Sequence, residues 1–176
     1  MAAELVKRGR GGGGVFSDRD HGSLVRYEGR SPEVIRPLGD DIDPFVAGLS
    51  VGPDGDLWAL MRTETDSYLG RLDGEDWIIH STADRLPPIS VGFFADDVDR
   101  LAVAPDGRVW FSVIPNEEDE APSGGLVVFD GQTFTRYLSG SWVADFAIAP
   151  DGSVWTTDTL DEGIRVIRPD EATAAE

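Results

Sequence analysis

Carboxylates stand close together at two places in this chain, at one of them beside a histidine, and these residue types are able to hold a divalent metal ion. The first place is Asp18-Arg-Asp-His21, where two carboxylates alternate with an imidazole. The second is Asp96-Asp-Val-Asp99. Such ligands suit Mg²⁺, Mn²⁺, Zn²⁺ or Ca²⁺. The candidate metal ligands are therefore Asp18, Asp20, His21, Asp96, Asp97 and Asp99.

Neither segment is sufficient by itself. A short loop supplies too few ligands, so Asp18–His21 needs help from Asp40, Asp41 or Asp96, and the fold must bring them together. If a cofactor is bound, we expect it to be Ca²⁺ or Mg²⁺. The simpler interpretation is that acidic loops only keep the protein in solution. No catalytic triad or carboxylate pair can be assembled, because hydroxyls and acids are scattered without a base in register.

The elements that must position these residues are visible as an internal repeat. Val46–Trp58 returns as Val98–Trp110 and again as Val143–Trp155, with no gap inside any copy. Each copy has a strand-like alternation of large and small residues, then Pro-Asp-Gly, then a tryptophan. Pro-Asp-Gly predicts a three-residue hairpin connection with glycine in the left-handed region. Positive φ angles are therefore expected at Gly55, Gly107 and Gly152.

A second repeat follows each hairpin and keeps its phase. It consists of a strand with an acidic-Gly turn, in the segments Ser23–Gly29, Tyr68–Gly74 and Gly125–Gly131, with a weaker copy at Gly163–Asp170. Two hairpins per repeat make a four-stranded antiparallel blade. Repetition of such a blade along the chain predicts an all-β fold, the β-propeller. In this fold each tryptophan is expected to fill the space between neighbouring blades.

The motif Asp-Gly-x-Val/Leu-Trp, followed by the run Gly124–Tyr137, resembles the two-component-regulator propeller repeat. It is more loosely similar to NHL repeats and to propellers of the virginiamycin B lyase type. The resemblance covers residues 15–170. It implies a propeller fold and a sensor module of a signalling protein. The lyase-like relatives imply a metal-dependent enzyme, whose catalytic His and Glu cannot be placed on this sequence.

The repeats set the expected boundaries. We expect a flexible segment over 1–14, blades at 15–37, 44–83, 96–138 and 142–170, and a polar tail at 171–176. The first blade has only Gly14–Ser17 as a remnant second strand, and the last has three strands, so about three and a half blades are present. Closed propellers have 4 to 8 blades. The chain is therefore predicted to be a partial propeller, completed by missing blades or by a second copy, or a distorted four-blade ring.

An incomplete ring leaves open sheet faces. We expect an apolar flank that includes Val15, Phe16 and Trp155.

The amino-acid composition excludes several classes of partner and chemistry. The formal net charge of the 176 residues is −18, which excludes nucleic acid, whose phosphates need a basic surface. No window is apolar over the length of a membrane span. The absence of cysteine excludes thiol chemistry and disulfides. Residues 1–14 do not have the pattern of a secretion signal. We therefore expect a cytoplasmic location, unless the chain is a fragment of a sensor, for which we expect an extracellular or periplasmic location. The composition is compatible with a bacterial source.

Two functions remain. The first is a non-enzymatic recognition or sensor module that binds a protein or small-molecule ligand through acidic loops, since long loops on a rigid scaffold usually carry binding. The second is a divalent-metal-dependent propeller enzyme of the lyase or lactone-hydrolase type. The start of each first strand should line the axis of a propeller, and there Asp99 and Asp145 are a sparse set of acids. This sparseness favours the first function over the enzyme.

Overall fold

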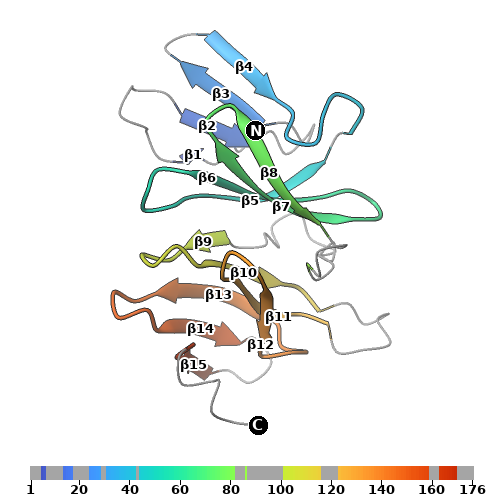
Figure 1. The fold of residues 1–176 in the computed structure, drawn as a ribbon. Coiled ribbons are helices and arrows are strands. Elements are labelled where there is room, and N and C mark those ends of the chain that lie inside the picture. The colour runs from blue at the N-terminus through green and yellow to red at the C-terminus, as the bar shows by residue number, and fades with distance from the viewer. Residues whose placement is uncertain are drawn as a thin grey trace. The chain divides into compact units, whose positions relative to one another are not determined.

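The computed structural model describes residues 5–6, 14–17, 24–28, 31–42, 44–81, 86, 101–115, 123–158 and 163–169. Every regular element among these residues is a strand (Figure 1). The strands form four antiparallel sheets, and in each sheet the neighbours along the chain are also neighbours by hydrogen bonding. The all-β architecture expected from the sequence is confirmed. The chain divides into two compact units, Met1–Pro87 and Pro88–Glu176.

The first unit contains two four-stranded sheets. The first sheet is formed by β1 (Leu5–Val6), β2 (Gly14–Ser17), β3 (Leu24–Glu28) and β4 (Ser31–Ile35). The second sheet is formed by β5 (Phe45–Val51), β6 (Leu57–Arg62), β7 (Ser67–Asp73) and β8 (Asp76–Ser81).

The second unit contains a four-stranded and a three-stranded sheet. The third sheet is formed by β9 (Leu101–Val103), β10 (Val109–Val113), β11 (Gly125–Phe129) and β12 (Phe134–Tyr137). The fourth sheet is formed by β13 (Val143–Ile148), β14 (Val154–Asp158) and β15 (Gly163–Ile167).

One strand differs from the expectation. Leu5–Val6 form β1, which pairs with Val15 and Phe16 of β2, so the first sheet has four strands where the sequence predicted three. The reason is backbone pairing: two residues are too few to show an alternating pattern, but each still contributes a donor and an acceptor to the edge of β2. The three strands of the fourth sheet agree with the prediction.

The Pro-Asp-Gly turns have the predicted geometry. Gly55, Gly107 and Gly152 have φ angles of 93°, 88° and 82°. In each turn the glycine N–H donates to the carbonyl three residues earlier, for example from Gly107 to Ala104 at 2.9 Å. The Ala104 N–H in turn donates to the Arg108 carbonyl at 2.8 Å. This is a type I turn followed by a glycine bulge, which reverses the chain over three residues.

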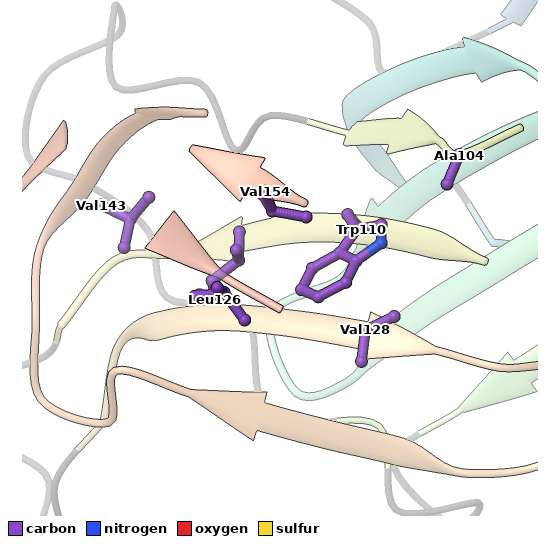
Figure 2. Close-up of a cluster of buried hydrophobic side chains, with 7 residues drawn as sticks. Ala104, Trp110, Leu126, Val128, Val143 and Val154 are labelled. Atoms are coloured by element: carbon purple, nitrogen blue, oxygen red, sulfur yellow. The ribbon is translucent and has the colours of Figure 1, made fainter. Parts of the chain in front are cut away.

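Each unit has a core between its two sheets. In the first unit, Leu24 of the first sheet packs with Val46, Ala59 and Met61 of the second. In the second unit, the buried group consists of Ala104, Trp110, Leu126, Val128, Val143, Val154 and Ile167. In Figure 2 the ring of Trp110 lies within this group. Trp110 fills the space between two sheets, as the repeat predicted, whereas Trp155 of the last sheet is 47% exposed because no further sheet follows among the described residues.

Candidate functional site

The sheets have two unlike ends. The turn end carries the tight turns between first and second strands and between third and fourth strands. The loop end carries the connections between second and third strands and those that lead from one sheet to the next. We use these two names below. Acidic side chains occur at both ends, but their surroundings differ.

The predicted metal ligands lie outside the described residues. This applies to Asp18, Asp20, His21, Asp96, Asp97 and Asp99. In the sequence, Asp18–His21 follows β2 and Asp96–Asp99 precedes β9. Within the part of the chain that the structure describes, no three His, Asp or Glu side chains form a group that could hold a metal ion. The metal site therefore stays a prediction from sequence.

The loop end of the second sheet has a described turn, Thr63–Asp66. The Thr63 N–H donates to the Asp66 carbonyl at 2.8 Å, and the Thr63 hydroxyl oxygen accepts from the Asp66 N–H at 3.1 Å. The Thr65 hydroxyl donates to Asp66 Oδ2 at 2.8 Å. These bonds place the Asp66 carboxylate within the turn, whereas Glu64 is exposed at its tip.

The connection from the first to the second sheet brings acids and an arginine together. Arg36 Nη1 lies 3.6 Å from Asp40 Oδ1, in an exposed ion pair. Asp41 follows and is also exposed. The guanidinium of Arg62, at the end of β6, lies over the ring of Phe45, 4.5 Å from its centre. These arginine contacts were not predicted from the sequence, although the spacing of Arg36 and Asp40 is compatible with an ion pair.

Two first strands are irregular near the loop end. The register of β5 shifts between Val46 and Gly48, and the register of β13 shifts between Val143 and Asp145. The two shifts fall at equivalent positions of the repeat. Bulges bend a strand and redirect its side chains, and they are common beside binding sites. Asp145, one of the two predicted axis residues, is exposed at this bulge.

Turn-end acids of the third and fourth sheets accept hydrogen bonds within their own turns. Asp151 Oδ1 accepts from the Ser153 hydroxyl at 2.6 Å and from the Ser153 N–H at 3.0 Å, and these bonds lower the pKa of Asp151. N–H groups of Thr133 and Gln132 donate to Asp130 Oδ1 at 2.7 and 2.8 Å and lower its pKa. For Asp106, burial raises the pKa, but hydrogen bonds and charge from Arg108 outweigh it, so the pKa is lowered. The turns account for these three carboxylates.

No family model and no curated protein matches the sequence. Solved structures do match in fold. Over 98% of the chain, it is similar to PorZ, a bacterial surface component of the type-IX secretion system of Porphyromonas gingivalis, with a TM-score of 0.68 and 15% identity. Over 93%, it is similar to virginiamycin B lyase from Staphylococcus aureus, with a TM-score of 0.55 and 14% identity.

A third similar structure is the extracellular domain of a protein described as a one component system of B. thetaiotaomicron, matched over 95% of the chain with a TM-score of 0.61 and 11% identity. The chain spans 25%, 54% and 21% of these three chains, respectively. At such identities the similarity shows the fold alone. The chain is an all-β protein of antiparallel sheets with the architecture of a partial β-propeller, as predicted.

No helix among the described residues is long and apolar enough to cross a membrane.

Proposed function

We propose that this chain is a non-enzymatic recognition module that binds a cationic ligand, or a basic surface of a protein partner, through its loop end. The observation that carries the proposal is the contrast between loop-end acids and the turn-end acids of the third and fourth sheets. There, Asp130 and Asp151 serve as hydrogen-bond acceptors for the turns. At the loop end, no hydrogen bond or ion pair among the described residues engages the carboxylates of Asp41 or Glu64.

Charge defines the ligand chemistry. With a net charge of −18, the whole molecule attracts cations, and exposed carboxylates such as those of Asp41 and Glu64 extend that potential to the loop end. Divalent cations and clustered Lys or Arg side chains fit such a surface. A ligand held this way binds more weakly as salt screens the field. Arg36 and Arg62 lie at the same end and place positive charges beside these carboxylates. Such a mixture of charges favours a ligand with a complementary arrangement of charges over a simple cation.

A sensor role is the form of recognition that the repeat motif supports best. The motif resembles that of two-component-regulator propellers, in which rigid blades present variable loops. In this chain the described sheets are also regular, and the exposed acids Asp41 and Glu64 lie at the loop end of the first unit. We propose that ligand binding at the loop end is the signal that such a module would report.

Isothermal titration calorimetry tests the proposal with two probes, Ca²⁺ and a hexalysine peptide. The test variant is Asp40→Asn/Asp41→Asn/Glu64→Gln. The matched control is Asp54→Asn/Glu75→Gln/Asp76→Asn, which removes the same charge from exposed positions at the turn end of the second sheet. We expect the affinity for at least one probe to fall at least about tenfold in the test variant, corresponding to roughly 1.4 kcal/mol, and to change little in the control.

Two results would contradict the proposal. One is the absence of binding by either probe at low salt. The other is an equal loss of affinity in the test and control variants, which would mean that only net charge matters. A separate variant, Asp96→Asn/Asp97→Asn/Asp99→Asn, tests the metal site predicted from sequence: loss of Ca²⁺ binding with retained hexalysine binding would locate the ion there.

A further inference from the structure

We propose that the outer face of the fourth sheet binds the outer face of the first sheet of a second copy of this chain. The outer face of the fourth sheet is the side opposite Val154, and it carries Trp155 and Ile164. The outer face of the first sheet is the side opposite Leu24, and it carries Tyr27 and Val34. Both faces have counterparts that already form a sheet-to-sheet contact within the chain.

The fourth sheet repeats a face that the third sheet buries. In the third sheet, Trp110 has Ala102 and Val128 as its cross-strand neighbours. In the fourth sheet, Trp155 has Ala147 and Val166 at the same registers. Leu126 pairs with Ser112 in the third sheet, and Ile164 pairs with Thr157 at the same register of the fourth. The two faces therefore share an apolar pattern, residue by residue.

Their exposure is opposite. Trp110 is 1% and Leu126 0% exposed, because Val143, Val154 and Ile167 of the next sheet pack against them (Figure 2). Trp155 is 47% and Ile164 70% exposed. The third sheet thus shows what kind of surface covers this pattern, namely the opposite face of another sheet of the repeat.

Trp155 is also held in place before any partner arrives. Its indole N–H donates to the Ser153 hydroxyl oxygen at 3.1 Å, and that hydroxyl donates to Asp151 Oδ1 at 2.6 Å. The side chain is anchored to the Pro-Asp-Gly turn by two hydrogen bonds. A fixed aromatic ring loses little rotamer entropy on association, which is why such rings often dominate binding energy.

The first sheet carries the matching face. Tyr27 pairs with Gly14 in the first sheet, and Ile167 pairs with Val154 in the fourth. Tyr27 and Ile167 therefore occupy equivalent positions of the repeat. Ile167 is one of the residues that cover Trp110. Val34 pairs with Val25 in the first sheet, as Ile79 pairs with Gly70 in the second. Val34 is thus equivalent to Ile79, which packs in the core of the first unit. Tyr27 is 39% and Val34 49% exposed.

A second copy satisfies both faces at once. Each chain carries one face of each kind, so the contact is heterologous, and a pair that closes on itself makes this contact twice. Two chains of four sheets supply eight sheets, which lies within the range of closed propellers. The contact repeats an interface already present inside the chain, where Trp110 meets the fourth sheet.

Light scattering coupled to size exclusion, over a series of protein concentrations, measures the association. We expect a species of twice 19.0 kDa that dissociates on dilution. Ile164→Asp and Val34→Asp should each be monomeric, because each buries a charge in the contact. Ile42→Asp is the control: its side chain is 39% exposed but lies in the connection between sheets, so the dimer should persist.

Mixing the two variants tests the orientation of the contact. Ile164→Asp keeps an intact first sheet, and Val34→Asp keeps an intact fourth sheet, so an equimolar mixture should recover a dimer through one of the two contacts. If instead Val34→Asp alone remains dimeric, the fourth sheet binds another fourth sheet and the proposal is wrong.

Thiol labelling identifies what covers the face if the chain is monomeric. The chain has no cysteine, so Ile164→Cys provides a single reactive thiol. A wild-type monomer overturns the proposal in either case: slow labelling means that the chain covers its own face, and fast labelling means that nothing does. The dependence on salt distinguishes this proposal from the recognition function. Salt screens the repulsion between two chains of charge −18 and so strengthens the dimer, whereas it screens the attraction between the chain and a cation and so weakens cation binding.

Discussion

At the scale of single residues, the aspartates of the tight turns act as acceptors that hold the backbone. Asp130 receives two N–H groups and the Thr133 hydroxyl, which donates to Oδ2 at 2.9 Å. An ionised carboxylate accepts these bonds better than a protonated one, so the folded state lowers the pKa of Asp130 below its ordinary value of 3.8. Stability from this turn is therefore complete above that value and is lost as the pH falls through the folded pKa.

Asp130→Asn should reduce the acid sensitivity of the fold. Asparagine keeps an oxygen that accepts the N–H bonds but has no proton to gain. We expect urea unfolding at pH values from about 5 to about 2 to show a smaller loss of stability in the variant than in the wild type. Asp76→Asn, at an exposed position, controls for the change in net charge. An equally steep loss in wild type and Asp130→Asn would contradict the assignment.

At the scale of elements, the hairpins depend on a glycine that other residues replace poorly. Gly107 has a φ of 88°, in the left-handed region, and a Cβ atom added there meets no heavy atom within 4 Å. The penalty for substitution is therefore conformational rather than steric. Gly125 is different: it has a φ of 105°, and an added Cβ would lie 2.5 Å from the Tyr137 carbonyl oxygen.

Gly107→Val should lower the free energy of unfolding by more than about 1 kcal/mol, because a β-branched side chain is strained at positive φ. Gly107→Asn should cost less, since asparagine tolerates this region. Denaturant melts of the three proteins measure the difference. Equal stability of the valine variant and the wild type would be inconsistent with the hairpin geometry.

The tryptophans test the packing between sheets. Trp110→Ala should cost about 3–5 kcal/mol, the range for a large buried side chain replaced by alanine. Trp155→Ala, at the same position of the next repeat, should cost roughly 1 kcal/mol or less when measured at a protein concentration low enough to separate copies. Chemical denaturation of both variants at that concentration gives the comparison, and equal losses would argue against the difference in burial.

Sequence alone predicted the parts of the fold that repeat. Pro-Asp-Gly has one low-strain solution between strands, so three hairpins and the φ angles of Gly55, Gly107 and Gly152 followed from local chemistry. Leu5–Val6 was missed because a two-residue strand is specified by its partner, not by its own pattern. Arg62 over Phe45 was missed for the same reason: the contact depends on the register between β5 and β6. The metal ligands Asp18, Asp20, His21, Asp96, Asp97 and Asp99 remain untested predictions.

At the scale of the whole molecule, the charge opposes compaction. The 33 acidic residues against 15 Lys and Arg leave a net charge of −18 on 176 residues. Repulsion among these charges is stronger in the compact state than in the unfolded chain, and mobile ions reduce it.

Neutral salt should therefore raise the melting temperature. We expect circular dichroism melts to shift upward by several degrees between low and physiological NaCl, a shift that corresponds to about 1 kcal/mol for a domain of this size. Repeating the series with MgCl₂ at matched ionic strength separates screening from binding, since a bound ion adds stability by mass action. A melting temperature that falls with NaCl would mean that the acidic surface is not a source of instability.

The order of strands also bears on how quickly the chain can fold. Every described strand pairs with a strand adjacent in sequence, and the turns at the turn end close over a few residues. Little loop-closure entropy is lost before each hairpin gains its contacts, whereas β-sandwiches must first bring distant segments together. Each sheet is therefore able to serve as a nucleus from which its neighbour is ordered, and we expect folding to proceed along the chain as in other repeat proteins.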